Sequence, residues 1–168
     1  MKYILDFDRT LFNSPSFVKR VEMDGRRDVL ITPQVWQTYK VQDFLYDDVL
    51  TWFNNKDKDN LYILTAISPQ LGNQSEAFQR EKLRSSGFGN LVSGIHFVVG
   101  EKGEKAAEMT VFVDDKIEQC LSVKNYLPNS FCFLMVRNRE LIGSAIKEVR
   151  GIKVVHNLNE VDAIIDSI

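Results

Sequence analysis

Residues 2–10 have the sequence KYILDFDRT, an apolar run that ends in two aspartates and a threonine. The first six of these residues predict a short buried strand. Asp6 and Asp8 lie two positions apart at its end, and side chains at i and i+2 of an extended strand point the same way. In an open α/β sheet, ligands collect at the carboxyl edge of the strands. A carboxylate pair at this edge indicates a metal ion and a nucleophile, because such a pair does not suit a hydrophobic core.

The rest of the chain alternates between apolar strands and amphipathic helices. Further strands are predicted at 61–66, 95–99, 110–113, 131–136 and 152–155. Helices are predicted to begin near Ser14, Thr32 and Tyr46, and to cover 76–85, 101–109, 117–125, 140–149 and 160–165. In the helix at 76–85, we expect Ala77, Phe78 and Leu83 to face inward. This order predicts an α/β fold, a three-layer α/β/α Rossmann-like parallel sheet with right-handed crossovers.

The segment 13–47 separates the end of the first strand from the helix that leads to the second. The pairs Ser14-Pro15 and Thr32-Pro33 are each typical of a helix N-cap followed by proline. We therefore expect a small helical insert within a single domain that spans 1–168.

Composition and charge argue against several classes of protein. The 168 residues carry a net charge of −2, which gives no strong nucleic-acid signature and no case for membrane binding. The first strand begins almost at Met1, so we expect no signal peptide, and no apolar run approaches the roughly 18 residues of a membrane span. Cys120 and Cys132 lack the spacing of a zinc site or a redox pair, and we expect both to be reduced and buried. We expect a cytoplasmic protein, and the oligomeric state stays open.

Two of the predicted strands end in acidic pairs, Asp6/Asp8 and Asp114/Asp115, and a third carries Thr65 at its end. If the strands are parallel, these groups meet at one edge of the sheet. Several carboxylates brought together repel one another unless a cation lies among them. Magnesium usually accepts one or two carboxylates together with substrate phosphate. A lysine and a threonine hydroxyl beside it provide the charge and the hydrogen bond that a phosphoryl group needs. The residues alone therefore predict magnesium-assisted phosphoryl chemistry.

The sequence resembles the haloacid dehalogenase (HAD)-like hydrolases, a family with four ordered motifs. The matching segments are DFDRTLF at 6–12, LTA at 64–66, a lysine near 102 and VFVDD at 111–115. The resemblance extends from residue 3 to about 120, in the family's order and strand contexts. The first motif, DxDxT directly after a strand, is the most specific. Arg9 stands where many members have glycine, and it adds a cation at the mouth of the site.

The resemblance implies roles for the acidic residues. Asp6 is implied to be the nucleophile that forms an aspartyl-phosphate, while its other oxygen ligates magnesium. Asp8 is implied to act as the general acid and then as the base for water, with its backbone carbonyl on the metal. Asp115 is implied to ligate the metal directly, with Asp114 assisting through water or as a second ligand. The presence of Asp8 favours phosphatase or phosphotransferase chemistry over dehalogenation.

Two further roles concern the phosphoryl group. The resemblance implies that Thr65 donates a hydrogen bond to it and that a lysine holds both the phosphate and the nucleophile. Lys102 and Lys105 are both candidates for this lysine. Lys102 is preferred because it lies closer to the end of the third strand, and hence to a helix N-terminus, where phosphate is favoured.

HAD-like hydrolases often carry a cap domain inserted after the first or the second motif. The resemblance therefore implies that the insert at 13–47 is a minimal cap. So small a cap implies an open or lightly covered site, which suits a bulky substrate. A small substrate is the alternative, if an oligomer partner supplies the missing wall.

The expected function is that of a magnesium-dependent phosphomonoester hydrolase acting through an aspartyl-phosphate. A nucleotidase or phosphotransferase with the same site is the alternative among enzymes. A non-catalytic phosphate-binding module on the same fold is the alternative from another class. The expected partner is a phosphorylated substrate, either a small molecule or a macromolecule.

Overall fold

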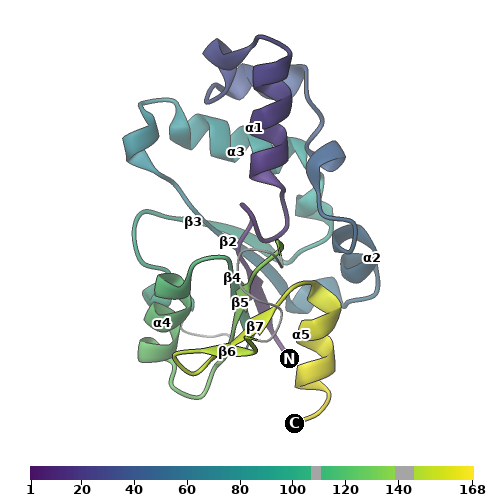
Figure 1. Ribbon diagram of the computed structural model, residues 1–168, viewed down its shortest axis with the longest axis vertical. Coiled ribbons are helices and arrows are strands. Elements are labelled where there is room, and N and C mark those ends of the chain that lie inside the picture. Colours follow the sequence, from purple (N-terminus) through teal and green to yellow (C-terminus); the bar gives the residue numbers. More distant parts are fainter. Residues whose placement is uncertain (107–110, 139–145) are drawn as a thin grey trace.

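A seven-stranded sheet forms the centre of the computed structural model, which describes residues 1–106, 111–138 and 146–168 (Figure 1). The order of the strands is β3-β2-β1-β4-β5-β7-β6, and every neighbouring pair except β6 and β7 is parallel. The strands are β1 (Tyr3–Leu5), β2 (Leu61–Ala66), β3 (Gly94–Val98), β4 (Val111–Asp114), β5 (Phe131–Met135), β6 (Glu148–Val149) and β7 (Ile152–Val155). The predicted α/β fold with a mainly parallel sheet is confirmed.

Helices cover both faces of this sheet. They are α1 (Ser14–Met23), α2 (Val49–Asn54), α3 (Ser75–Ser85), α4 (Ile117–Tyr126) and α5 (Leu158–Ile165). Because side chains alternate along a strand, Leu5 and Val113 join the hydrophobic cluster that contains α2 and α5. Ile4 and Phe112 join the opposite cluster, which contains α4. Figure 1 shows α4 on one side of the sheet and α2 and α5 on the other, so the three predicted layers are present.

The order in which the chain adds strands to the sheet changes direction between β1 and β4. It runs outward from β1 to β2 and β3, then returns to place β4 on the other side of β1. Leu5 pairs with Val113, and the amide of Asp6 donates to the carbonyl of Val113 at 2.8 Å. Asp6, which follows β1, and Asp114, which ends β4, therefore lie at the same register position at the carboxyl edge of the sheet. Such a switch point is where open α/β sheets bind their ligands.

The insert consists of α1 followed by three short 3₁₀ turns, at Arg27–Val29, Pro33–Gln37 and Val41–Phe44. The helix predicted to begin near Thr32 is a 3₁₀ helix of five residues, with Thr32 as its N-cap and proline in its first turn, and it does not continue as an α-helix. Aromatic and β-branched residues favour helix only weakly, and the turns let them pack inward together. The rings of Phe17 and Trp36 stack at 4.7 Å, and the Trp36 indole donates to the carbonyl of Phe78 in α3 at 3.2 Å. The insert is thus packed against α3.

Near the C-terminus, the predicted helix at 140–149 is wrong at its end, where Glu148–Val149 forms β6; 139–145 lie outside the described residues. A two-residue turn joins β6 to β7 because Arg150 and Gly151 both adopt positive φ, 51° and 77°. Within the predicted helix at 101–109, Gly103–Ala106 is a 3₁₀ turn, and 107–109 again lie outside the described part.

Cys120 and Cys132 are buried and free, as predicted. Among the described helices, none has the length and apolar character that crossing a membrane requires.

Candidate active site

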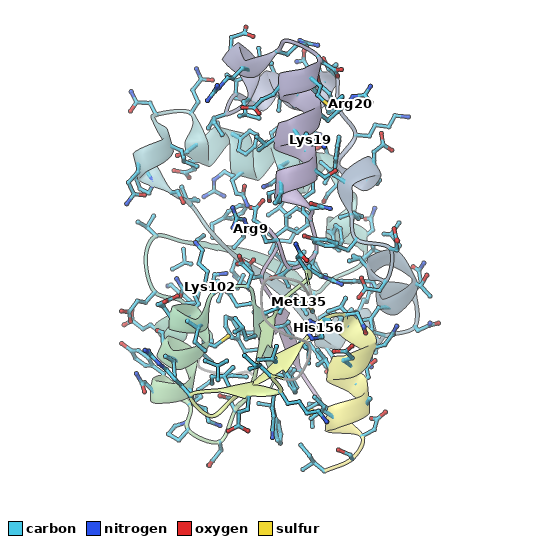
Figure 2. The ribbon with its side chains drawn as sticks, in the orientation of Figure 1. Arg9, Lys19, Arg20, Lys102, Met135 and His156 are labelled. Carbon is cyan, nitrogen blue, oxygen red and sulfur yellow. The ribbon has the colours of Figure 1, made fainter. Side chains whose placement is uncertain are left out.

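Lys102, which is labelled in Figure 2, contacts two of the predicted acids, Asp6 and Asp114. Its side chain is almost fully buried, and its ammonium group donates to Oδ1 of Asp6 and, at 2.7 Å, to Oδ2 of Asp114. Its backbone amide donates to the Gln119 side chain at 2.8 Å, which fixes the turn that carries it. Lys105 is exposed instead. Of the two candidate lysines, the structure therefore brings Lys102 to the carboxylates.

Three carboxylates are placed to hold a cation. Oxygen atoms of Asp6, Asp114 and Asp115 all lie within 4.8 Å of one another. Oδ2 of Asp6 is buried without a hydrogen-bond partner in the described part of the chain, an arrangement that is costly for a carboxylate. Both oxygens of Asp114 accept hydrogen bonds, from Lys102 and from the amide of Lys116 at 2.9 Å. The residues fit magnesium, a hard cation, with Asp6 and Asp115 as the acids that have oxygens to spare.

Protonation of this cluster depends on burial. Burial raises the pKa of Asp6 to about 7, against the opposing charge of Lys102 and with the help of Asp114. Burial and the charge of Asp6 raise the pKa of Asp115 to about 6. For Lys102, burial favours the neutral form, but Asp6 and Asp114 outweigh it and raise the pKa. A bound divalent cation would shift both acids back to the ionised form.

The side chain of Asp8 lies apart from this group and faces α3. It accepts hydrogen bonds from Ser14 at 2.7 Å, from Gln79 at 2.8 Å and from the ammonium group of Lys82 at 2.6 Å. Burial acts to raise the pKa of Asp8, but Lys82 and the other donors lower it. Gln79 also donates to the hydroxyl of Thr65 at 2.8 Å. The side-chain amide of Gln79 thus contacts one residue of each of the first two motifs, Asp8 and Thr65.

Sequence reasoning missed Gln79 and Lys82. In α3, Ala77 is exposed, contrary to expectation, while Gln79 and Lys82 are 5% and 1% exposed. The Lys82 ammonium group also lies 4.9 Å from the centre of the Phe12 ring and 5.2 Å from that of Phe78, within cation–π range. The helical spacing of Gln79, Lys82 and Leu83 with Phe78 was the available signal.

A further missed residue, Arg137, follows β5 and supports the loop after β1. Its guanidinium group donates to the carbonyl of Thr10 at 2.6 Å and to Asp48 at 2.7 Å. The side chain is only 8% exposed, so the two contacts form inside the protein. Arg137 therefore ties the first motif to the segment that begins α2. No motif marks it in the sequence.

Arg9 adopts a conformation that is unusual for a residue other than glycine. Its φ is 62°, which lets its amide donate to the carbonyl of Phe12 at 2.7 Å and closes the turn after β1. The side chain is exposed and lies between the insert and Lys102 (Figure 2). The departure from glycine thus costs backbone strain and places a cation at the site, where strained residues are often found.

A cavity of about 500 Å³ lies directly over the carboxylates. Its wall includes every predicted site residue, namely Asp6, Asp8, Thr65, Lys102, Asp114 and Asp115. The insert contributes Phe17, Val18, Leu30 and Ile31 to the same wall. Although it is small, the insert supplies one side of the cavity wall.

Comparisons with solved structures give the same fold. YfnB from Bacillus subtilis, assigned as a HAD-hydrolase and solved bound to magnesium, is 14% identical with a TM-score of 0.56, over 98% of each chain. A HAD-like family hydrolase from Xanthomonas campestris is 11% identical with a TM-score of 0.58, over 99% of this chain and 95% of that one. The UTR4 protein from Saccharomyces cerevisiae is 11% identical with a TM-score of 0.52, over 95% and 98%. No family model and no curated protein matches the sequence. The chain has the fold of the HAD-like hydrolases.

Proposed function

We propose that this protein is a magnesium-dependent hydrolase of phosphomonoesters that acts through an aspartyl-phosphate on Asp6. One observation carries the proposal: Oδ2 of Asp6 is a buried carboxylate oxygen without a partner among the described residues, beside the ammonium group of Lys102. A purely structural acid in this position would satisfy both of its oxygens. The fold and the order of the motifs are the second support.

In the first step, a carboxylate oxygen of Asp6 attacks phosphorus. The ester P–O bond breaks, and its electron pair leaves with the alcohol oxygen. In the second step, water attacks the phosphorus and gives a proton to Asp8, while the P–O bond to Asp6 breaks; phosphate is released and the carboxylate of Asp6 is restored. Lys102 and Thr65 stabilise the phosphoryl oxygens by charge and by a hydrogen bond. Asp6 and Asp115 would hold magnesium, which supplies positive charge against the developing negative charge.

The hydrogen bonds to Asp8 favour the second part of its expected role, as the base for the attacking water. Lys82 and Ser14 donate hydrogen bonds to its carboxylate and favour the ionised form. An ionised Asp8 is ready to accept the proton of the attacking water. Donating a proton to a leaving alcohol requires the protonated form, which the Lys82 contact disfavours. Phenolate leaving groups need no proton, so an aryl phosphate is the most direct first substrate.

The decisive experiment measures phosphate release from an aryl phosphate with magnesium, with a chelator, and with Asp6→Asn. We expect activity that requires the metal and falls by at least about 10³-fold in the variant, as for loss of a nucleophile. Asp166→Asn is the matched control, because Asp166 is exposed and lies outside the cavity wall. Acid quenching with labelled substrate should trap phosphate on the wild type and not on Asp6→Asn.

The alternatives give different results in the same experiment. A phosphotransferase would deliver the phosphoryl group to an added alcohol faster than to water. A binding module would release no phosphate, and its affinity for inorganic phosphate would survive Asp6→Asn. Activity that persists undiminished in Asp6→Asn would contradict the mechanism.

A further inference from the structure

The cavity combines a charged floor with an apolar wall. Its ionisable residues gather at the carboxyl edge of β1 and β4, where Asp6 and Asp115 lie. Val18, Leu30 and Ile31 of the insert line it together with Ile67 and Leu71, which follow β2. A ligand whose phosphate sits on the floor would place the rest of its structure against this wall.

Four apolar side chains of the wall, those of Val18, Leu30, Ile31 and Leu71, are at least partly accessible in the free protein. Leu71 is 56% exposed, although leucine is a residue that folding usually buries. Val18, Leu30 and Ile31 are half-buried and border the same space. A ligand with an apolar body would cover these side chains and gain free energy by removing them from water.

Polar side chains in the wall are largely engaged with the protein itself. Gln79 donates to Asp8 and Thr65, and Ser14 donates to Asp8. Gln119 accepts from the Lys102 amide and donates to the carbonyl of Gly100 at 3.1 Å. A ligand with many hydroxyl groups would leave several of them without partners here, and each unpaired buried group weakens binding.

Two neutral hydroxyls in the wall, those of Ser68 and Ser75, make no side-chain hydrogen bond within the described part of the chain. These two hydroxyls can form hydrogen bonds with one or two polar groups of a ligand at most. The remaining cations of the wall, Arg9 and Lys116, are exposed and lie beside Asp115, where they favour the phosphate itself. The wall therefore discriminates by apolar surface more than by hydrogen bonds.

We propose that the cavity selects phosphomonoesters whose alcohol or phenol portion is an apolar alkyl or aryl group, in preference to sugar phosphates. This inference rests on the proposed function and names the substrate class of the same site. The volume of about 500 Å³ is in the range of small-molecule pockets and holds a phosphate with a body of this kind.

The test compares kcat/KM for a series of primary n-alkyl phosphates from ethyl to hexyl, together with glucose 6-phosphate. Hexyl phosphate and glucose 6-phosphate are both six-carbon esters of a primary alcohol, so they differ chiefly in their hydroxyl groups. We expect kcat/KM to rise by about fourfold for each added methylene. We expect hexyl phosphate to exceed glucose 6-phosphate by at least about tenfold.

Leu71→Ser is the informative variant, and Leu50→Ser is its matched control. Both leucines are exposed, 56% and 40%, but Leu50 lies in α2 and outside the cavity wall, so neither change should unfold the protein. We expect Leu71→Ser to reduce kcat/KM for hexyl phosphate by about tenfold, with little change for ethyl phosphate. A series without chain-length dependence, or an unaltered series in Leu71→Ser, would overturn the inference.

Binding separates failure of this inference from failure of the proposed function. n-Alkylphosphonates have the same apolar bodies but cannot be hydrolysed, and calorimetry with magnesium measures their affinity directly. If no phosphate ester turns over, the proposed function fails, and a fourfold gain in phosphonate affinity per methylene still supports the apolar pocket. Equal affinity for methylphosphonate and hexylphosphonate would overturn the pocket whatever the turnover shows.

Discussion

The ammonium group of Lys82 lies 2.6 Å from Oδ1 and 2.7 Å from Oδ2 of Asp8, and the lysine side chain is 2% exposed. A lysine this deeply buried is rare unless it is paired. Asp8 supplies the partner, and the rings of Phe12 and Phe78 surround the charge. The ion pair joins the first motif to α3, so it connects the chemistry of the site to the packing of the helix.

This ion pair predicts unequal costs for removing its two members. Asp8→Asn leaves the buried Lys82 charge uncompensated and should lower the free energy of unfolding by about 3–5 kcal/mol. Lys82→Met should cost less, about 1–2 kcal/mol, because the Asp8 side chain is 37% exposed and keeps the Ser14 and Gln79 hydrogen bonds. Urea unfolding measures both values. The double variant should be more stable than Asp8→Asn alone.

The control for this pair is Glu76→Gln. It breaks the exposed Glu76–Arg80 contact and should change stability by less than about 0.5 kcal/mol. Equal losses for Asp8→Asn and Lys82→Met would contradict the asymmetry that burial predicts.

Lys102 and Lys105 are three residues apart and should behave very differently. Lys102→Met removes the cation that contacts Asp6 and Asp114, and we expect kcat to fall by at least about 10²-fold. Lys105→Met removes an exposed charge, so kcat should stay within about twofold of the wild type. Steady-state kinetics on an aryl phosphate decide between them. A larger loss for Lys105→Met would reverse the assignment.

The acidic cluster predicts how stability depends on pH. The pKa values of Asp6 and Asp115 are raised to about 7 and about 6, so the folded protein binds more protons than the unfolded chain between their unfolded pKa and these values. The free energy of unfolding should therefore be higher near pH 5 and fall as the pH rises towards 8 in the absence of metal. Thermal melts in a chelator measure this slope.

Magnesium should reverse the slope, because it binds the ionised carboxylates and competes with protons. The increase in Tm on adding magnesium should therefore be larger at pH 8 than at pH 5. Asp6→Asn removes one of the titrating groups and should flatten the metal-free curve. The prediction would be refuted by a metal-free Tm that rises steadily with pH and does so equally in Asp6→Asn and in the wild type.

Replacing Arg9 should affect the stability of the protein and its binding of substrate in opposite directions. Arg9→Gly relieves the positive φ of 62°, and the free energy of unfolding should stay the same or rise by up to about 1 kcal/mol. The same change removes a cation from the cavity wall, so KM for a phosphoester should rise by about twofold to fivefold. Arg150→Gly is the matched control, with φ 51° in the turn before β7. It should match the stability effect and leave KM unchanged.

Much of the site was predictable because its residues follow strands. A run such as residues 2–8 is a local pattern, and the carboxyl ends of parallel strands meet at one edge whatever the loops do. Asp6, Thr65, Asp114 and Asp115 therefore came together in the structure as the strand assignments implied. The parallel α/β sheet followed from the alternation of strands and helices, whereas the HAD-like fold was expected from the resemblance of the motifs.

The residues that complete the site were decided by tertiary packing. Lys82 meets Asp8 from 74 positions away, and Arg137 meets Thr10 from 127 positions away. The Arg137 contact leaves no local pattern. Lys82 has the helical spacing of the buried face of α3, but a lysine on a helix is usually solvated and is buried only when the folded chain offers a counter-charge. The insert shows the same limit, because its aromatic residues formed turns packed on α3 where the local signals favoured a helix.

The sequence by itself therefore predicted which carboxylates lie at the ends of the strands, because this depends on local periodicity and residue type. The tertiary structure alone decided which lysine reaches Asp6, which charge accompanies Asp8, and which apolar side chains face them across the cavity. The physical reason is that these contacts depend on the burial and mutual position of elements distant in the chain. Such terms are set only when the whole core has formed.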